Sequence, residues 1–225
     1  MPQHVGIILD GNRRFAKRLM LQPWKGHELG AKKIEDLLDW AQELGISEFT
    51  LYCLSVENIK SRPENELDFL FKLFRKEFRD IDREKIEKNN IRIRFIGNLS
   101  LLPQELQEQC IKLEKETSKN DKITINFALA YGGRQEITEA VRKIVQSKLK
   151  PEEISEEVVE KNLYLSSQPD LIIRTGGDKR TSNFLPWQSV YSEWFFLDKC
   201  WPEFDKQDLI NCISEFENRE RKFGA

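Results

Sequence analysis

Residues 4–14 read HVGIILDGNRR, a short apolar strand that stops on a carboxylate. The polar groups that close it are an acid, a glycine, an amide and two guanidinium groups, from Asp10, Gly11, Asn12, Arg13 and Arg14. Glycine lets the backbone approach a ligand closely. Arginines form forked, charge-assisted hydrogen bonds with phosphate oxygens, and a carboxylate is a hard oxygen ligand of the kind that Mg²⁺ uses. The stretch therefore predicts a site for a phosphate-bearing ligand held with a metal. An ordinary β-turn is the alternative, because Asp-Gly and Gly-Asn pairs are common in turns.

Composition narrows the class of protein. The chain has 225 residues, enough for one sizeable domain over 1–225, and its 39% hydrophobic and 33% charged residues are typical of globular proteins. A net charge of -2 argues against a nucleic-acid binder, so any affinity for phosphate must be local. The four cysteines form no Cys-x-x-Cys pair, and no signal peptide precedes the first strand. We therefore expect neither a secreted disulfide framework nor structural zinc, but a cytoplasmic protein. The sequence contains no apolar run of ~18 residues, the length that a membrane-spanning helix needs.

Strand patterns alternate with helical patterns along the chain. The expected strands are His4–Leu9, Glu48–Leu54, Ile91–Ile96, Lys122–Ala130 and Leu171–Arg174. The expected helices are Gly30–Leu44, Pro63–Lys88, Pro103–Thr117, Arg134–Gln146 and Asp205–Glu220. Residues 148–160 are polar and are expected to form a surface loop with a short helix. This alternation predicts an α/β fold, a single domain with a central, mostly parallel β-sheet and helices on both faces.

Four of the five predicted strands end in glycines, small polar side chains or arginines, over residues 10–14, 55–58, 131–134 and 174–183. In open parallel sheets, ligands bind beyond the carboxyl ends of the strands, so we expect these segments to converge. Neither the Gly-x-Gly-x-x-Gly fingerprint nor the P-loop is present, which argues against common nucleotide sites. His27 lies at a predicted helix entrance, where it either contacts an anion or packs and caps the helix. His4 is expected to be structural.

The predicted helix from Pro63 carries a wide apolar stripe. Its normal buried positions are Leu67, Phe71, Phe74, Phe78 and Ile81, and Phe69, Leu70 and Leu73 widen the stripe beyond one face. The extra residues either contact a neighbouring helix or line an apolar cavity. A cationic, metal-bearing mouth above an apolar tunnel would suit an amphiphile with a diphosphate head and a hydrocarbon tail.

Together these residues resemble the cis-prenyltransferases, the undecaprenyl and polyprenyl diphosphate synthases. The resemblance runs nearly end to end, through separate blocks in order: residues 4–14, 26–27, 51–58 with 62–63, 126–134, 171–183, 187–193, 201–202 and 218–224. It implies a Mg²⁺-dependent homodimer that extends an allylic diphosphate starter with isopentenyl diphosphate, each new double bond being cis. The long polyprenyl diphosphate would serve as a precursor of glycosyl carrier lipids. It further implies no nucleic-acid partner and a transient membrane-surface contact for product release.

The resemblance also implies roles for individual residues. Asp10 would be the central carboxylate and would help to hold Mg²⁺, with Glu193 as the second metal carboxylate, reached across the dimer in some family descriptions. The allylic diphosphate would bind Gly11, Asn12, Arg13, Arg14 and His27, and the isopentenyl diphosphate would bind Arg174, Arg180 and Ser182. Ser55, Glu57 and Asn58 would flank the reacting carbons. Phe15, Val56, Arg62 and Thr181 complete the expected substrate contacts. Asn58 is the family's proton acceptor, but an amide is a very weak base, so we favour a positioning or relay role and a leaving diphosphate that takes the proton.

Several positions depart from the family pattern. Arg13 stands where bacterial members have glycine, Phe15 where they have tryptophan, and Ile59 where they have an aromatic residue. One residue is inserted before Arg62-Pro63, and Lys222 replaces the arginine of a C-terminal signature. Pro23 occupies the place of an arginine that grips the diphosphate, and Arg13 or Lys25 is expected to compensate.

The Asn-Arg-Arg-Phe form is more archaeal or eukaryotic than bacterial, which leaves farnesyl and geranylgeranyl diphosphate open as starters. The alternatives to this enzyme are a non-catalytic subunit of the same fold, an unrelated nucleotide-binding module and a trans-prenyl synthase. Asp10 and Glu193 are both present, which argues against a non-catalytic subunit. The missing glycine fingerprints argue against a nucleotide-binding module, and the missing aspartate-rich motifs argue against a trans-prenyl synthase.

Overall fold

The computed structural model describes residues 1–219, and within them one six-stranded sheet organises the chain. The strand order is β3-β4-β2-β1-β5-β6, and every neighbouring pair is parallel. The strands are β1 (His4–Ile8), β2 (Glu48–Ser55), β3 (Ile91–Ile96), β4 (Ile123–Tyr131), β5 (Leu171–Arg174) and β6 (Glu193–Phe196). All five residues of β1 are buried, as expected for the centre of a parallel sheet.

Helices connect the strands. The α-helices are α1 (Asn12–Arg18), α2 (Pro23–Leu44), α3 (Val56–Ser61), α4 (Glu64–Asp80), α5 (Arg83–Lys88), α6 (Gln104–Glu116), α7 (Gly133–Gln146), α8 (Glu156–Asn162) and α9 (Lys206–Asn218). Three short 3-10 helices are η1 (Leu99–Leu101), η2 (Pro151–Glu153) and η3 (Trp201–Glu203). Within residues 1–219, no helix combines the length and the apolar character needed to cross a bilayer.

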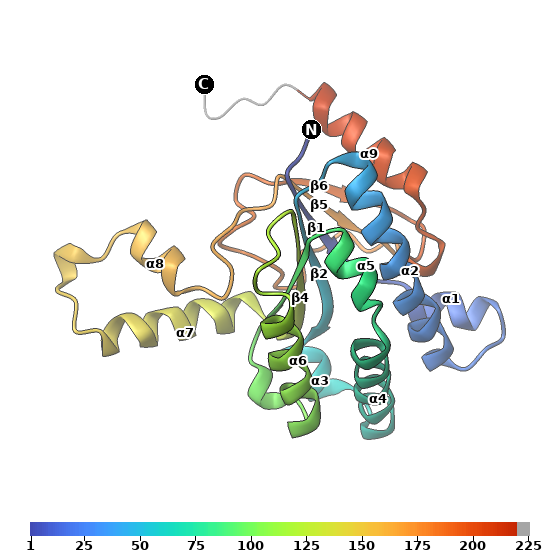
Figure 1. The fold of residues 1–225 in the computed structure, drawn as a ribbon, viewed down its shortest axis with the longest axis horizontal. Coiled ribbons are helices and arrows are strands. Elements are labelled where there is room, and N and C mark those ends of the chain that lie inside the picture. Colours follow the sequence, from blue (N-terminus) through green and yellow to red (C-terminus); the bar gives the residue numbers. More distant parts are fainter. Residues whose placement is uncertain (220–225) are drawn as a thin grey trace.

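The core has two unequal parts on the two sides of the sheet. The larger part packs β-strand side chains such as Phe49 and Ile125 against α2, α4, α6 and α9. The smaller part lies under the segment that follows α8, with Leu165, Phe184 and Leu185 against Ile172. In Figure 1, α2 and α4 lie to the right of the sheet, while α7 and α8 extend to its left as an arm. The predicted α/β fold with one mostly parallel sheet is confirmed.

Two strand predictions, Ile91–Ile96 and Leu171–Arg174, have the bounds of β3 and β5, and the others differ by a residue at one or both ends. The predicted helix over Pro63–Lys88 is wrong at one point. Ile81 is extended there, and the Asp82 side chain accepts a hydrogen bond from the Lys85 N–H at 2.9 Å, so that α5 starts afresh. α2 also starts earlier than predicted, at Pro23. The end of the last predicted helix, Glu220, and Lys222 lie outside the described residues.

The segment after β1 is a helix start and not only a turn. Gly11 adopts a left-handed conformation, with φ +96°, and α1 follows directly. A Cβ at Gly11 would also lie 2.9 Å from the Cys200 Cα, so both conformation and space require glycine. α1 then packs on α2 and presents Arg13 and Arg14 beyond the carboxyl end of β1.

The strand order places the site. The chain runs from β1 outward through β2 on one side, and later returns to pair β5 with the other side of β1. The carboxyl ends of β1 and β5 therefore form the switch point, where open α/β sheets bind ligands. Asp10 and Arg174 stand at that point.

Candidate active site

Asp10 and Arg174 form an ion pair at the centre of the site. The Arg174 Nη2 donates to the Asp10 Oδ2 at 2.8 Å, and the Gly11 N–H donates to Oδ1 at 2.7 Å. The Arg174 side chain is only 3% exposed, whereas that of Asp10 is 31% exposed. The carboxylate is thus held by a buried cation and remains partly exposed to solvent. The Arg174 Nε is buried without a hydrogen-bond partner.

The loop after β5 brings further cations to the same place. Arg174 also donates to the Ser182 Oγ at 2.7 Å and to the Arg180 carbonyl. Asp178 in this loop accepts from Arg180 at 2.9 Å, and Arg14 approaches it to 3.3 Å. Arg14 also lies 3.6 Å from Asp10. Three guanidinium groups therefore surround two carboxylates, an arrangement that can exchange its internal ion pairs for phosphate oxygens.

Gly176 allows this close approach. Its φ is +90°, and a Cβ there would come within 2.7 Å of the Arg14 Nη2 and 3.0 Å of the Gly11 nitrogen. A side chain at this position would push the two loops apart. Thr175 joins them as well, because its hydroxyl donates to the Asp10 carbonyl at 2.8 Å.

His27 of α2, Arg62 at the end of α3 and Glu66 of α4 form a second polar cluster beside the site. The Arg62 Nη1 donates to the Glu66 Oε1 at 2.8 Å and lies 3.3 Å from the His27 Nε2, while Arg13 lies 3.7 Å from Glu66. Burial above all, and then the charges of Arg62 and Arg13, lower the pKa of His27 from 6.5 to about 3. The imidazole is therefore neutral near pH ~7, and its Nε2 accepts a hydrogen bond from Arg62.

Helix α3 begins directly after β2, at the same edge of the sheet. The Ser55 Oγ caps this helix by accepting from the Asn58 N–H at 2.9 Å, and Val56 is buried. The Asn58 side-chain oxygen accepts a long hydrogen bond of 3.4 Å from Arg62. Glu57 accepts from the Asn183 amide at 3.0 Å. The ends of β2 and β5 therefore meet, as expected from the sheet rule.

Two adjoining hollows open at this edge of the sheet. The first, of about 450 Å³, is lined mostly by charged and polar residues and lies between α1, α2 and the loop after β5. The second, of about 960 Å³, runs between α2, α4 and the sheet. The two share lining residues Leu9, Asp10, Asn12, His27 and Arg62. We call them the head pocket and the tail cavity.

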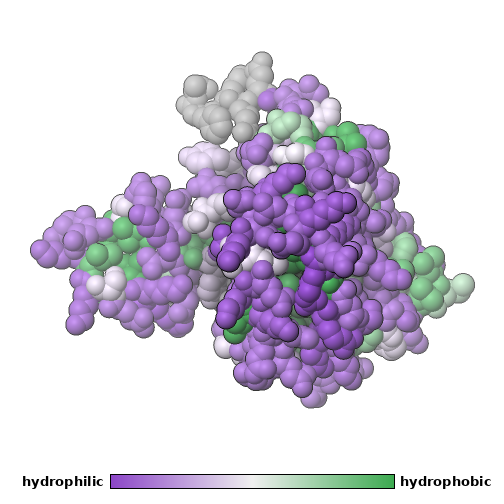
Figure 2. Space-filling model, in the orientation of Figure 1, coloured by the Kyte–Doolittle hydropathy of each residue, from purple (hydrophilic) through white to green (hydrophobic). Residues whose placement is uncertain are grey.

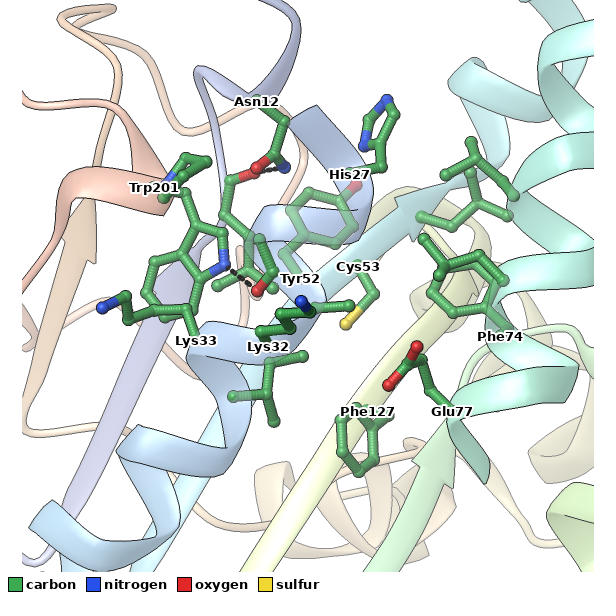
Figure 3. Close-up of a pocket in the computed structure, with 18 of the residues that line it drawn as sticks. Asn12, His27, Lys32, Lys33, Tyr52, Cys53, Phe74, Glu77, Phe127 and Trp201 are labelled. Carbon is green, nitrogen blue, oxygen red and sulfur yellow. Dashed lines mark hydrogen bonds between the residues drawn. The ribbon is translucent and has the colours of Figure 1, made fainter. Parts of the chain in front are cut away.

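The tail cavity has an apolar interior. Leu70, Leu73 and Phe74 of α4 line it opposite Leu38 of α2, and Ile93, Ile125 and Phe127 of the sheet line its depth. Figure 3 shows Phe74, Phe127 and Cys53 around the same space as His27 and Asn12, with Glu77 as an acidic side chain in the wall. Leu70 and Leu73 thus line a cavity, which is one of the two roles that the sequence left open for them. Phe69 instead packs on Trp24 of α2, with ring centroids 6.1 Å apart, as the neighbouring-helix alternative expected.

Most predicted site residues converge on these two hollows. The tail cavity or the head pocket is lined by Asp10, Gly11, Asn12, Arg13, Arg14, Phe15, His27, Ser55, Asn58, Arg62, Arg174, Arg180 and Ser182. Val56 and Glu57 lie beside them in α3, and Thr181 lies exposed in the loop between Arg180 and Ser182. Pro23 is the first residue of α2, a position that suits proline.

Glu193 does not join Asp10 within one chain. It is the first residue of β6 and lies level with Leu171, at the amino end of the strands, whereas Asp10 follows the carboxyl end of β1. The two are separated by roughly 15 Å along the strands alone. Glu193 pairs with Arg219 in its own chain. A single chain therefore cannot use Asp10 and Glu193 as ligands of the same ion.

The donors around Asp10 fit a magnesium ion that binds together with its substrate. In residues 1–219, no group of three or more His, Cys, Asp or Glu side chains is placed to cage a metal. Magnesium is commonly bound through one or two carboxylates, with phosphate oxygens and waters completing its shell. Asp10 is partly exposed and offers such a carboxylate, and Asp178 lies on the far side of Arg14. The oxygen donors present suit a shell completed by a diphosphate.

Two carboxylates that pair with the arginines of the site were not predicted. Asp178 lies in the Gly-Gly-Asp segment after β5, and a carboxylate between glycines and basic residues was a usable signal. Glu66 looked like an ordinary acid in a first helical turn. Its spacing of four residues from Arg62 was the only local sign that it would pair with that half-buried cation.

Known proteins are similar to this chain in sequence and in fold over its whole length. A family model described as "Putative undecaprenyl diphosphate synthase" matches residues 8–224. The chain is 47% identical to a tritrans,polycis-undecaprenyl-diphosphate synthase (geranylgeranyl-diphosphate specific) of Methanopyrus kandleri, over 100% of the chain and 85% of that protein. A protein of the same description from Pyrococcus furiosus is 45% identical, over 100% of the chain and 87% of its own length.

Two solved structures have the same fold. The lavandulyl diphosphate synthase of Lavandula x intermedia, in complex with dimethylallyl diphosphate, has a TM-score of 0.94 at 34% identity, over 100% of this chain and 98% of that one. A probable undecaprenyl diphosphate synthase from Campylobacter jejuni has a TM-score of 0.85 at 36% identity, over 100% and 99%. The family match and the archaeal relatives agree with the geometry of the site, and the chain belongs to the undecaprenyl diphosphate synthase family of prenyltransferases.

Proposed function

We propose that this enzyme extends an allylic diphosphate with isopentenyl diphosphate units, each added with cis geometry, to a long polyprenyl diphosphate. The observation that carries the proposal is the direct junction of a cationic head pocket with an apolar tail cavity, at Asp10, His27 and Arg62. A diphosphate head and a hydrocarbon tail require these two environments side by side. Such a product is a precursor of glycosyl carrier lipids, and the chemistry involves no nucleic acid.

Geranylgeranyl diphosphate is the starter that we favour. The names of the archaeal relatives from Methanopyrus kandleri and Pyrococcus furiosus specify it. The fold alone does not choose a reaction, because the lavandulyl diphosphate synthase structure, with a TM-score of 0.94, is more similar in shape than the undecaprenyl one, with 0.85. Farnesyl diphosphate is the second candidate.

Different residues would bind the two substrates. Arg13, Arg14 and the α1 amino terminus would hold the allylic diphosphate, and Arg174, Arg180 and Ser182 the isopentenyl diphosphate. Magnesium, bound through Asp10 and the diphosphate oxygens, would neutralise negative charge on the leaving group. As the allylic carbon–oxygen bond breaks, its electron pair goes to the diphosphate, and preplaced guanidinium groups stabilise that charge.

The new carbon–carbon bond forms from the isopentenyl double bond, and a proton must then leave. The side-chain oxygen of Asn58 accepts a hydrogen bond from Arg62, and an amide is a very weak base. This contact suits a residue that positions the substrate and does not take the proton. The departing diphosphate is the better proton acceptor. Each added unit that moves into the tail cavity contributes up to ~4 kcal/mol of burial, at ~0.8 kcal/mol per carbon, which favours further extension.

The second carboxylate for the metal is Asp178 of the same chain, or Glu193 supplied by a partner subunit. A homodimer provides the second route. Its interface is suggested by the α7–α8 arm, which carries exposed apolar side chains at Val141, Val145 and Ile154. We also infer that the apolar product leaves the enzyme at a membrane surface.

The activity test uses purified protein, Mg²⁺, labelled isopentenyl diphosphate and either starter, with products resolved by chromatography against length standards. We expect long polyprenyl diphosphates, made faster from the C20 starter. A protein that binds nucleotides but makes no prenyl product, or that works only with an added second subunit, would refute the proposal.

Asp10 variants test the site directly. Asp10→Ala removes the nearest carboxylate from the buried Arg174 guanidinium and leaves it Asp178 at 3.8 Å, so it should lose activity and also roughly 2 kcal/mol of stability. Asp10→Asn keeps an acceptor for Arg174 and removes only the charge. We expect it to fold, as checked by circular dichroism, and to lose at least ~100-fold in kcat. Full activity of Asp10→Asn would show that the carboxylate does not act in the reaction.

A further inference from the structure

Three consecutive apolar side chains stand exposed between α1 and α2. Leu19, Met20 and Leu21 are 49%, 95% and 43% exposed. We call residues 19–21 the apolar tip. It forms the green patch at the right edge of Figure 2, where Figure 1 shows the loop that follows α1. Single exposed apolar residues are common, but a contiguous group that projects from the surface marks an interaction site.

The tip is held in shape by its backbone. The Met20 N–H donates to the Lys17 carbonyl at 3.1 Å, and the Leu21 N–H donates to the Ala16 carbonyl at 2.9 Å. Met20 has a φ of +55°, a left-handed conformation that methionine rarely adopts. The chain therefore turns at the one residue whose side chain points most fully into solvent. The exposure of the tip is a built feature and not a frayed end.

The tip adjoins the mouth of the tail cavity. Phe15 of α1 and Leu19, the residue that ends this helix, both line that cavity. The apolar lining thus continues outward from the cavity, over Leu19, to Met20 and Leu21 on the surface. An apolar chain leaving by the mouth would meet these side chains first.

Basic side chains flank the tip. Lys17 and Arg18 occupy the last turn of α1, and Lys25 lies at the start of α2. Arg18 pairs with Glu203, and Lys25 pairs with Glu28 at 2.7 Å, whereas Lys17 has no acidic partner within the described residues 1–219. Apolar side chains beside lysine and arginine are the combination that binds the interface of an anionic bilayer.

We propose that the apolar tip inserts into the headgroup region of an anionic membrane and places the mouth of the tail cavity against lipid. The growing or finished polyprenyl tail then passes from the cavity into the bilayer without crossing water. This inference rests on the proposed function, since that function supplies an apolar product. It assigns the membrane contact to a defined surface, residues 17–21.

The test is flotation of the full-length protein with vesicles, without substrate. One set is phosphatidylcholine mixed with phosphatidylglycerol, and the other is phosphatidylcholine alone. The tip variant is Met20→Asn with Leu21→Ser, chosen because asparagine tolerates a positive φ. Lys17→Gln tests the charge. Ile111→Asn is the matched control, an exposed apolar residue on α6, 60% exposed and outside the lining of both hollows.

We expect the wild type to float with the mixed vesicles, and the tip variant to lose about tenfold in partitioning. Lys17→Gln should lose about fivefold with the mixed vesicles and nothing with phosphatidylcholine alone. Ile111→Asn should float like the wild type. Circular dichroism and gel filtration check that each variant is folded and unchanged in oligomeric state.

The proposal is overturned if the wild type does not float, if the tip variant floats equally well, or if Ile111→Asn is impaired to the same degree. A tip variant that changes the oligomeric state instead would identify the tip as a contact between copies of the chain. Because flotation requires no turnover, a protein without prenyl-extending activity would still give a clear result for the membrane surface.

Discussion

Arg13 is the residue best placed to replace the arginine that Pro23 displaces. It lines the head pocket, its side chain is 57% exposed, and Glu66 lies 3.7 Å away. Lys25, the other candidate, pairs with Glu28 at 2.7 Å and lines neither hollow. The geometry favours Arg13 as the second grip on the allylic diphosphate.

Exchange of Arg13 for glutamine should therefore weaken binding of the allylic substrate. A charge-assisted hydrogen bond contributes ~1.5 kcal/mol or more, so Arg13→Gln should raise the KM for the starter about tenfold with little change in kcat. Lys25→Gln is the matched control and should leave both constants unchanged. Steady-state kinetics with the starter varied decides the question, and an equal effect of the two substitutions would contradict the assignment.

His27 makes the stability of the enzyme depend on pH. Burial and the nearby Arg62 lower its pKa from 6.5 to about 3. Between these values the unfolded chain binds a proton that the folded protein does not bind. The contribution of the neutral ring to stability is therefore complete above pH ~6.5, and it falls by roughly 1.4 kcal/mol per pH unit below that.

Urea unfolding at pH ~7 and pH ~5 measures this term. The wild type should lose more stability over this interval than His27→Gln, which cannot take up the proton. The comparison cancels the other titrating groups, because both proteins share them. Equal losses in the two proteins would mean that His27 titrates normally in the folded state.

Single residues also show where sequence reasoning reached its limit. The rule for parallel strands predicted that the segments containing Asp10, Arg174 and Ser182 would converge, and the family resemblance supplied the roles of these residues. Glu66 and Asp178 were missed, because a carboxylate on a surface pattern looks the same whether or not it faces a buried arginine. Glu193 was predicted from resemblance alone, and nothing in the sequence reveals on which end of β6 it lies.

At the scale of elements, α4 separates the tail cavity from the rest of the core. Leu73 is 7% exposed and lines the cavity, so a larger side chain there projects into empty space instead of overpacking. Leu73→Trp should fold and should shift the products to chains about two five-carbon units shorter. Ile111→Trp, on the exposed face of α6, is the control and should leave the product length unchanged. Chromatography of the products tests both, and unaltered products from Leu73→Trp would place the tail elsewhere.

Elements with a clear apolar pattern were predictable, and elements without one were not. β3 alternates apolar residues with arginine, and β5 is a short apolar run that ends at Arg174, so both had recognisable bounds. α1 and α3 are seven and six residues long and take their starts from Gly11 and from the Ser55 cap, too little sequence for a helical period. β6 is a four-residue edge strand, and it depends on pairing with β5. The break between α4 and α5 contains neither glycine nor proline, and it follows from the cap at Asp82.

At the scale of the whole molecule, the α7–α8 arm presents an exposed apolar surface. It extends away from the sheet, and Figure 2 shows apolar side chains gathered on it at the left. Val145 is 72% exposed and Val141 is 49% exposed, one helical turn apart on α7. A second copy of the chain in two-fold symmetry would cover these side chains, and it would also bring a second Glu193 into the assembly.

Mixed dimers test whether Glu193 acts across such an interface. Asp10→Asn and Glu193→Gln chains, each inactive alone, are co-expressed with different tags and the mixed dimer is purified. If Glu193 serves the partner's site, one of the two sites contains both an intact Asp10 and an intact Glu193, so the mixed dimer should recover about half of the wild-type activity. If Glu193 acts within its own chain, both sites remain defective and no activity returns. If Glu193→Gln is already active alone, Asp178 is the second carboxylate. The position of Glu193 at the opposite end of the strands from Asp10 makes the first outcome the expected one.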